Sequence, residues 1–201
     1  MADALRFGFL AGYAVALVVL VVRVLPLAAR IPGSAQRATG ARRWLPAVLL
    51  PVAFLVPPAI MLARVGELDR AWPVVRLAGL ALGLYAAVMM LRAAATLGRQ
   101  LVPQAVVFPD HALATSGPYA LVRHPAYSGD LALWLGAALA TLDVVLLALW
   151  PLYLVATTAE ARVEERLLEA RFGPAYADYA QRTGRFVPRL IGRLTARRVA
   201  S

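Results

Sequence analysis

Long apolar runs constrain this chain more than any other feature of its sequence. Spanning a bilayer takes about 20 mostly apolar residues, because in hydrocarbon the backbone N–H and C=O groups must be satisfied inside a helix. Three runs have about this length, at 7–29, 45–63 and 73–91, and the stretch at 127–159 suits two more spans. Since 61% of the 201 residues are hydrophobic, we predict an all-α integral membrane protein with about five transmembrane helices.

The last apolar stretch predicts a helical hairpin followed by a charged helix. Its turn is expected at Thr141-Leu142-Asp143, with Asp143 capping the second helix. The chain becomes charged at Glu160 and keeps a helical pattern to Phe172, before a Gly-Pro pair that is typical of a helix end. The segment from 92 to 124, rich in glycine, proline and polar residues, is expected to be a long structured loop.

The arginines predict how the spans are oriented. The loop after the first span holds four arginines and no acidic residue, whereas the loop after the second holds two arginines and two acidic residues. Basic loops remain in the cytoplasm, so the first loop, the 92–124 loop and the arginine-rich C-terminus are expected inside and Asp143 outside. The basic tail is interpreted as a segment held to anionic lipid, and no nucleic-acid partner is expected.

Two residue types are missing, and their absence excludes several kinds of chemistry. The chain has no lysine and no cysteine, which excludes a Schiff base, a thiolate nucleophile and a zinc-thiolate site. The only histidines are His111 and His124, too few for a multi-histidine metal centre. We therefore expect no catalytic metal.

Two charged segments flank the hairpin, and the hairpin brings them to one membrane surface. The first runs from Ser116 into Arg123-His124-Pro125, where Pro125 suits the first turn of a helix and leaves His124 at the cap. The positive end of that helix can receive a carboxylate or phosphate. In the second segment Glu160 and Glu164 share a helix face. Taken singly, a histidine at a helix start is more often a cap than a catalytic group, and two glutamates on an ordinary helix form a solvated face.

Together, however, these segments resemble a known family. The string GPYALVRHPAYSG, then an apolar hairpin, then EARVEERLLEARFGPAYADY, is similar to the integral-membrane methyltransferases of the isoprenylcysteine carboxyl methyltransferase and phospholipid methyltransferase superfamily. The resemblance covers about residues 113–179. It implies that S-adenosylmethionine is enclosed at the cytoplasmic surface by these residues: Tyr119, Arg123, His124, Pro125, Tyr127, Gly129, Glu164 and Glu165.

The resemblance also implies a role for Arg162, and the chemistry of methyl transfer adds further catalytic candidates, although the family name does not identify the acceptor. Arg162 matches an arginine that in the family can face the methyl acceptor, and Arg123 and Glu165 complete the expected set. A carboxylate acceptor needs an arginine to hold it but no base, whereas a thiol or amine must lose a proton to Glu165, His124 or water. A lipophilic acceptor with a carboxylate is favoured. The chain is accordingly divided into a three-span region at 1–91 and a catalytic region at 92–201.

Two other classes of function are weighed against this one. The C-terminal region also resembles membrane sterol reductases, which use a nicotinamide cofactor and need a basic cluster for its 2′-phosphate. A non-catalytic transport or assembly protein is the other alternative. A transporter is expected to carry ionisable groups near mid-membrane, whereas Arg23 and Arg76 lie near the ends of their spans.

Overall fold

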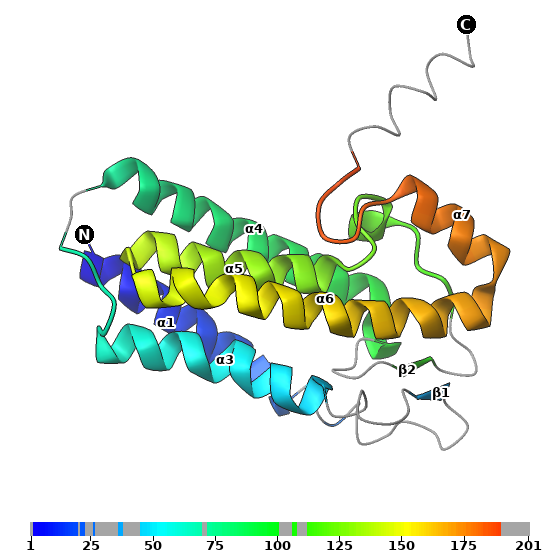
Figure 1. The fold of residues 1–201 in the computed structure, drawn as a ribbon, viewed down its shortest axis with the longest axis horizontal. Coiled ribbons are helices and arrows are strands. Elements are labelled where there is room, and N and C mark those ends of the chain that lie inside the picture. The colour runs from blue at the N-terminus through cyan, green and yellow to red at the C-terminus, as the bar shows by residue number, and fades with distance from the viewer. Residues whose placement is uncertain are drawn as a thin grey trace, which may run out of the picture.

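A bundle of long helices makes up most of the chain. The computed structural model describes residues 2–19, 21–22, 26, 36–37, 45–69, 72–100, 106–107 and 112–189. Its main elements are the helices α1 (Ala2–Val19), α3 (Leu45–Ala63), α4 (Pro73–Leu97), α5 (Pro125–Thr141), α6 (Val144–Phe172) and α7 (Pro174–Arg182), drawn in Figure 1. The strands β1 (Gln36–Arg37) and β2 (Val106–Val107) form one short antiparallel pair. The predicted all-α membrane fold is confirmed.

Among the described residues, three helices are long and apolar enough to cross a membrane: α3, α4 and α6. Large apolar side chains on their outer faces, such as Leu55, Leu84 and Val155, are exposed, as expected of surfaces that face lipid. The helices α1 and α5, of 18 and 17 residues, lie in the same bundle (Figure 1). That these two also span the bilayer stays a prediction.

Of the first three predicted spans, the second agrees with a helix at both ends, the third agrees only at its start, and the predicted end of the first, at Ala29, lies outside the described residues. The second span coincides with α3, which continues through three internal prolines. The helix α4 runs six residues past the predicted end at Leu91, because the alanine-rich sequence after Arg92 favours a helix. It ends at Gly98, whose φ of 53° only glycine adopts easily. The first helix begins at Ala2, five residues before the predicted start at Phe7.

The predicted hairpin turn is confirmed. Leu142 takes the left-handed conformation that ends α5, and Asp143 caps α6 by accepting hydrogen bonds from the N–H groups of Val145 and Leu146 at 2.9 and 3.0 Å. The indole of Trp134 donates to the carbonyl of Leu146 at 3.1 Å. These bonds fix how α6 lies along α5, and therefore how the charged end of α6 faces the start of α5.

The helices α4 and α5 approach each other closely through glycines. A Cβ atom at Gly79 would lie 2.4 Å from the backbone nitrogen of Ala140, and one at Gly136 would lie 2.8 Å from the carbonyl oxygen of Gly79. Small residues allow two membrane helices such contact. Arg76 adds a hydrogen bond to the carbonyl of Ala140 at 2.7 Å. This contact holds α5, and His124 is the residue just before that helix.

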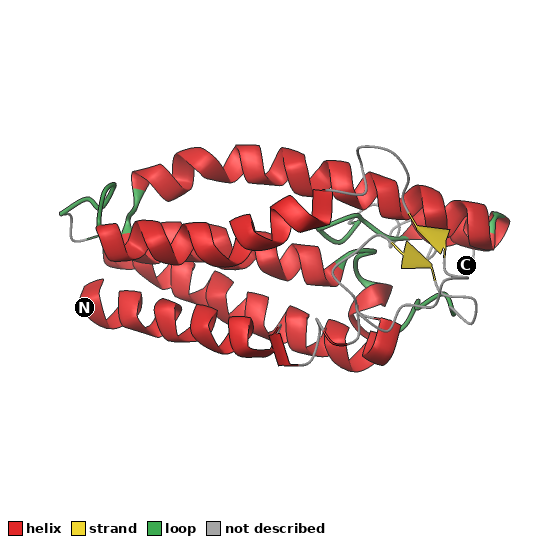
Figure 2. Cartoon of the chain, turned by 90° about the horizontal axis from the view of Figure 1, so that it is seen from below, coloured by secondary structure: helices red, strands yellow, loops and turns green. Residues whose placement is uncertain are grey.

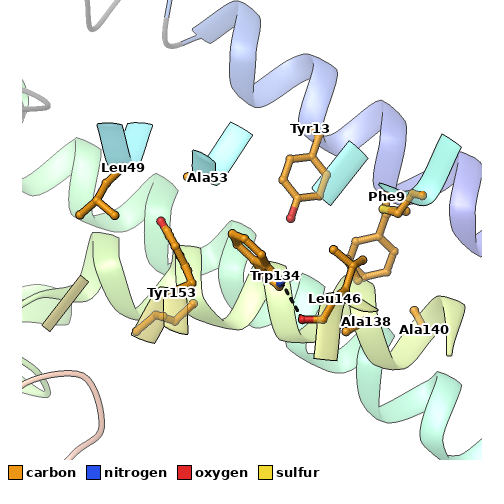
Figure 3. Packing of buried hydrophobic residues seen from close by; sticks show 12 residues of the cluster. Phe9, Tyr13, Leu49, Ala53, Trp134, Ala138, Ala140, Leu146 and Tyr153 are labelled. Carbon is orange, nitrogen blue, oxygen red and sulfur yellow. Dashed lines mark hydrogen bonds between the residues drawn. The ribbon is translucent and has the colours of Figure 1, made fainter. Parts of the chain in front are cut away.

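Aromatic side chains fill the centre of the bundle. Figure 3 shows Phe9 and Tyr13 of α1 pointing toward Trp134 of α5 and Leu146 of α6. The rings of Trp134 and Tyr153 stack at a centroid distance of 4.5 Å. This apolar core separates the two polar ends of the molecule.

The hairpin turn and the loop after α3 meet at one end of the bundle. Leu68 N donates to the carbonyl of Leu142 at 3.1 Å, and Val144 N donates to that of Gly66 at 3.0 Å. Arg6 of α1 bonds to Glu67 in the same loop. In Figures 1 and 2 the N-terminus lies at this end, and α7 and the two strands lie at the other. The N-terminus, the loop after α3 and the hairpin turn thus lie at one end of the bundle, the grouping that the predicted alternation of spans requires.

Candidate active site

The site is built at the start of α5, around a buried histidine. His124 precedes Pro125, the first residue of α5, and its side chain makes no capping hydrogen bond. Its Nδ1 lies 3.5 Å from Oε2 of Glu164, and its Nε2 lies 3.3 Å from Oε1 of Glu165. The imidazole is 3% exposed and stacks on the ring of Tyr127 at 5.5 Å. The histidine therefore faces the glutamate pair of α6, as the hairpin predicts.

Two opposing effects set the protonation of His124. Burial lowers the pKa of His124, but contacts with Glu164 and Glu165 raise it further, so the net pKa lies above the usual 6.5. The pair with Glu165 is electrostatic, since Nε2 has no hydrogen-bond partner of normal geometry among the described residues. A protonated His124 thus neutralises part of the charge of two carboxylates.

A segment after α7, which we call the C-terminal strap (183–186), lies against the start of α5. Arg123 N donates to the carbonyl of Gly184 at 2.8 Å, and His124 N donates to that of Arg185 at 3.1 Å. Further along, Oγ of Ser128 donates to the carbonyl of Phe186 at 2.7 Å. The strap therefore fixes the position of the backbone at Arg123 and His124.

Glu165, on α6, connects the strap to α6 and to the start of α5. Arg123 Nε donates to its Oε1 at 3.0 Å, and Arg185 donates to both oxygens at 3.0 and 2.6 Å. Arg123 also donates to the carbonyls of Ala180, at 2.9 Å, and Thr183. Both oxygens of Glu165 are thus engaged within the protein.

A cavity of about 1400 Å³ opens beside His124 and continues into the apolar bundle. At the His124 end its walls carry Arg123, Tyr127, Glu160 and Glu164, and farther in they carry apolar side chains such as Leu133. The space therefore joins a charged end to an apolar interior. A molecule with a polar head and a lipophilic part matches this distribution.

Three tyrosines line the same cavity from the loop and α7: Tyr119, Tyr176 and Tyr179. The hydroxyl of Tyr179 donates to the carbonyl of Tyr119 at 2.8 Å, whereas the buried hydroxyl of Tyr176 has no partner among the described residues. Burial raises the pKa of Tyr119 and Tyr176 above 10, and that of Tyr179 to about 12. All three are neutral phenols at physiological pH, and Tyr176 is free to bond a ligand.

The structure separates the predicted site residues into two groups. Five of them line the cavity: Tyr119, Arg123, His124, Tyr127 and Glu164. Among the others, Pro125 forms the first turn of α5, and Glu165 is bonded to Arg123 and to Arg185 of the strap. Gly129 packs on α4, where a Cβ atom would lie 2.7 Å from Met90. Arg162 is exposed on α6 and is not among the residues that line the cavity. His111 lies outside the described residues.

Several cavity residues were not among the predicted site residues. Tyr176 and Tyr179 belong to the quoted C-terminal string, and their spacing of three on a short helix was a usable signal. Asp130, which also lines the cavity, is a charged residue within an apolar hairpin, a recognised sign of function in membrane proteins. Glu160 was singled out for its helix face, and that face is the cavity wall. The strap had no sequence signal, because its bonds to the start of α5 are accepted by its backbone carbonyls.

Taken together, the apolar helices and this charged cavity define a helical membrane protein with a ligand site at one end of its bundle. Comparison with known protein families gives the class a name: residues 74–175, about half of the chain, match the phospholipid methyltransferase family. The chain belongs to this family of membrane methyltransferases. The matched stretch begins in α4 and ends in α7, so it contains the hairpin and the adjacent Glu164 and Glu165.

Curated relatives match a similar part of the chain. The cobalt-zinc-cadmium resistance protein CzcN of Cupriavidus metallidurans is 44% identical over 86 residues, 40% of this chain and 38% of that protein. The nickel-cobalt-cadmium resistance protein NccN of Alcaligenes xylosoxydans xylosoxydans is 38% identical over 79 residues, 39% of this chain and 37% of that protein. A protein-S-isoprenylcysteine O-methyltransferase of Tribolium castaneum is 32% identical over 87 residues, 41% and 30% of the two chains. The chain thus matches well under half the length of each relative.

Proposed function

We propose that this chain transfers a methyl group from S-adenosylmethionine to a lipophilic acceptor, at the cytoplasmic face of a membrane. The acidic lining of the cavity carries the proposal. Asp130, Glu160 and Glu164 line it, while its one described arginine, Arg123, is bonded to Glu165. S-adenosylmethionine, with a sulfonium, an ammonium and a carboxylate, has a net positive charge and suits such a lining.

The residues at the cavity mouth fit the polar groups of this cofactor. Glu164 is 31% exposed and can accept hydrogen bonds from ribose hydroxyls or the amino group. The unpaired hydroxyl of Tyr176 and the His124 imidazole can donate to a carboxylate. When bound, the cofactor supplies a methyl group already activated on sulfur. The protein then needs only to align the acceptor and exclude water, and a cavity that reaches from His124 into the apolar bundle supports the alignment.

A nicotinamide cofactor is disfavoured by the same lining. Its 2′-phosphate needs unpaired arginines, and three carboxylates at the cavity wall repel phosphate. Among the described residues, no group of three or more His, Asp or Glu side chains is arranged so that it could hold a metal ion.

Isothermal titration of the purified full chain with S-adenosylmethionine, with NADPH as competitor, tests the proposal. We expect saturable binding that NADPH does not displace. His124→Ala and Glu164→Gln should each weaken it about tenfold or more, because each removes a charge-assisted contact. Glu169→Gln, on the exposed side of the same helix, should leave it unchanged. Binding of NADPH in place of S-adenosylmethionine would contradict the proposal.

A further inference from the structure

A stripe of polar side chains continues from the His124 end of the cavity into the apolar bundle. On α6 its members are spaced four, three and four residues apart, which places them on one helix face, and all line the cavity: Tyr153, Thr157, Glu160 and Glu164. On α5, Tyr127 and Asp130 line the cavity three residues apart. Since a helix rises about 1.5 Å per residue, Asp130 lies about 9 Å deeper than His124 along α5.

The carboxylate of Asp130 is only partly satisfied by the protein. The Tyr153 hydroxyl donates to its Oδ2, and no described residue donates to Oδ1. Tyr153, its hydrogen-bond partner, stacks in turn on Trp134 of the aromatic core. An acidic group in an apolar cavity with an oxygen left over is a place for a hydrogen-bond donor from a ligand.

A second polar atom at this depth also lacks a partner. Thr157 is 2% exposed and lines the cavity one turn from Tyr153. Its Oγ1 lies beside the Tyr153 hydroxyl, but no described residue forms a hydrogen bond of normal geometry with it. Buried hydroxyls are normally paired, so this one independently indicates a polar group of a ligand.

The charges around this position favour one kind of acceptor over another. A carboxylate arriving from the apolar side would meet Asp130 first, then Glu160 and Glu164. The described arginine on the cavity wall, Arg123, is held by Glu165 and two carbonyls. Arg162, which was predicted to hold a carboxylate, is exposed and is not among the cavity's lining residues. A neutral group with a proton to give can instead bond to Asp130.

Building on the proposed function, we infer that the acceptor is a lipophilic molecule whose nucleophile carries a proton, as a hydroxyl, thiol or amine does, and that Asp130 receives this proton. As the acceptor attacks, its lone pair forms the bond to the methyl carbon. The C–S bond breaks and its electron pair stays on sulfur, which becomes a neutral thioether. The acceptor's proton passes to Oδ1 of Asp130 and reaches water past Glu160 and Glu164. One positive charge is lost from sulfur and one proton is released, so the step balances.

Four compounds with the same C12 chain test the inference: dodecanol, dodecanethiol, dodecylamine and dodecanoate. The full chain in phosphatidylcholine nanodiscs is given methyl-labelled S-adenosylmethionine and each probe. We expect label on at least one protic probe and little on dodecanoate. Asp130→Asn, which keeps an acceptor for Tyr153, should lower protic methylation by about 100-fold or more, the contribution typical of a general base. Preferred labelling of dodecanoate, an unchanged rate in Asp130→Asn, or no labelled probe at all would each overturn the inference.

Direct binding measurements separate this inference from the proposed function. In isothermal titration, Asp130→Asn should weaken binding of the best protic probe more than that of S-adenosylmethionine, and Thr157→Val should weaken binding of the same probe several-fold without lowering the melting temperature. Asp178→Asn, exposed on α7, is the control for loss of one acidic group. A wild-type chain that fails to bind S-adenosylmethionine contradicts the proposed function. Normal cofactor binding with no preference for protic probes contradicts the acceptor inference alone.

Discussion

At the scale of single residues, Glu165 shows how one carboxylate can hold several segments together. It is 14% exposed, bonds to Arg123 and Arg185 and forms an ion pair with His124; these partners come from the start of α5 and from the C-terminal strap. Removing its charge leaves two guanidinium groups without their partner. The expected role of this glutamate is therefore to position the strap and the histidine.

We expect Glu165→Gln to lower the free energy of unfolding by about 2 to 3 kcal/mol. This is below the ~3–5 kcal/mol typical of breaking a fully buried pair, because Arg185 is 30% exposed. Hydrogen exchange should rise across residues 183–186. Arg162→Gln, an exposed change on the same helix, should alter stability by less than about 0.5 kcal/mol. Equal stability of the two variants would remove Glu165 from this role.

The pKa of His124 predicts a pH dependence of stability. Because contacts with Glu164 and Glu165 raise the pKa of the folded state above 6.5, the protonated histidine stabilises the fold fully below pH 6.5. That contribution is lost as the pH rises through the folded-state pKa. Melting temperatures measured from about pH 6 to about pH 9 should fall more in wild type than in His124→Gln. Parallel curves for the two proteins would show that the ion pairs do not stabilise the fold.

Residue patterns predicted the centre of the site better than its edges. The hairpin predicted that His124 and Glu164 meet, because it brings two nearby sequence motifs together, whereas Tyr127 was singled out by the family resemblance. Glu165 was predicted beside its neighbour as a cofactor ligand, but adjacent helix residues point about 100° apart, and only Glu164 faces the cavity. Arg185 lies outside the quoted motif, so its pairing with Glu165 depends on a tertiary contact that no sequence period encodes.

At the scale of helices, the contact between α4 and α5 determines where the site stands. The backbones meet at Gly79 and Gly136, where an added Cβ atom would lie within 2.4 to 2.8 Å of backbone atoms. The apolar periods of these helices predicted that they form, but not which faces meet. The turn between α5 and α6, in contrast, was predictable, because Asp143 caps a helix through its own neighbours.

Gly79→Ala and Gly136→Ala should therefore each destabilise the protein by about 1 to 3 kcal/mol, since the helices must separate to admit a methyl group. Gly8→Ala and Gly12→Ala in α1 are the matched controls, because a Cβ atom there meets nothing within 4 Å. These two should be neutral or slightly stabilising, as alanine favours a helix over glycine. Thermal unfolding in detergent measures all four. A similar loss in controls and test variants would mean that the glycines do not act through this contact.

At the scale of the whole molecule, the fold puts the hairpin turn and the loop after α3 at one end and the candidate site at the other. Basic residues in the loop after the first span and in the tail predict that the site end is cytoplasmic. Composition alone was enough to predict a helical membrane protein. The cavity was not predictable in that way, since it arises from helices far apart in the sequence.

Reporter fusions test the predicted orientation in cells. Fusions at Ala41 and Ser201 should both report a cytoplasmic location, and a fusion at Glu67 should report the opposite side, because an odd number of spans separates it from each of the others. Agreement of all three reporters would contradict the five-span arrangement and the placement of the site inside the cell.

The most direct test of the proposed site is a structure of the full chain bound to S-adenosylhomocysteine, the product form of the cofactor. We expect its density in the cavity beside His124, with Glu164 and Tyr176 in contact with its polar groups and its sulfur directed toward Asp130. Density outside this cavity, or contacts to Arg162 and Glu165 in place of Glu164 and Tyr176, would contradict the site described above.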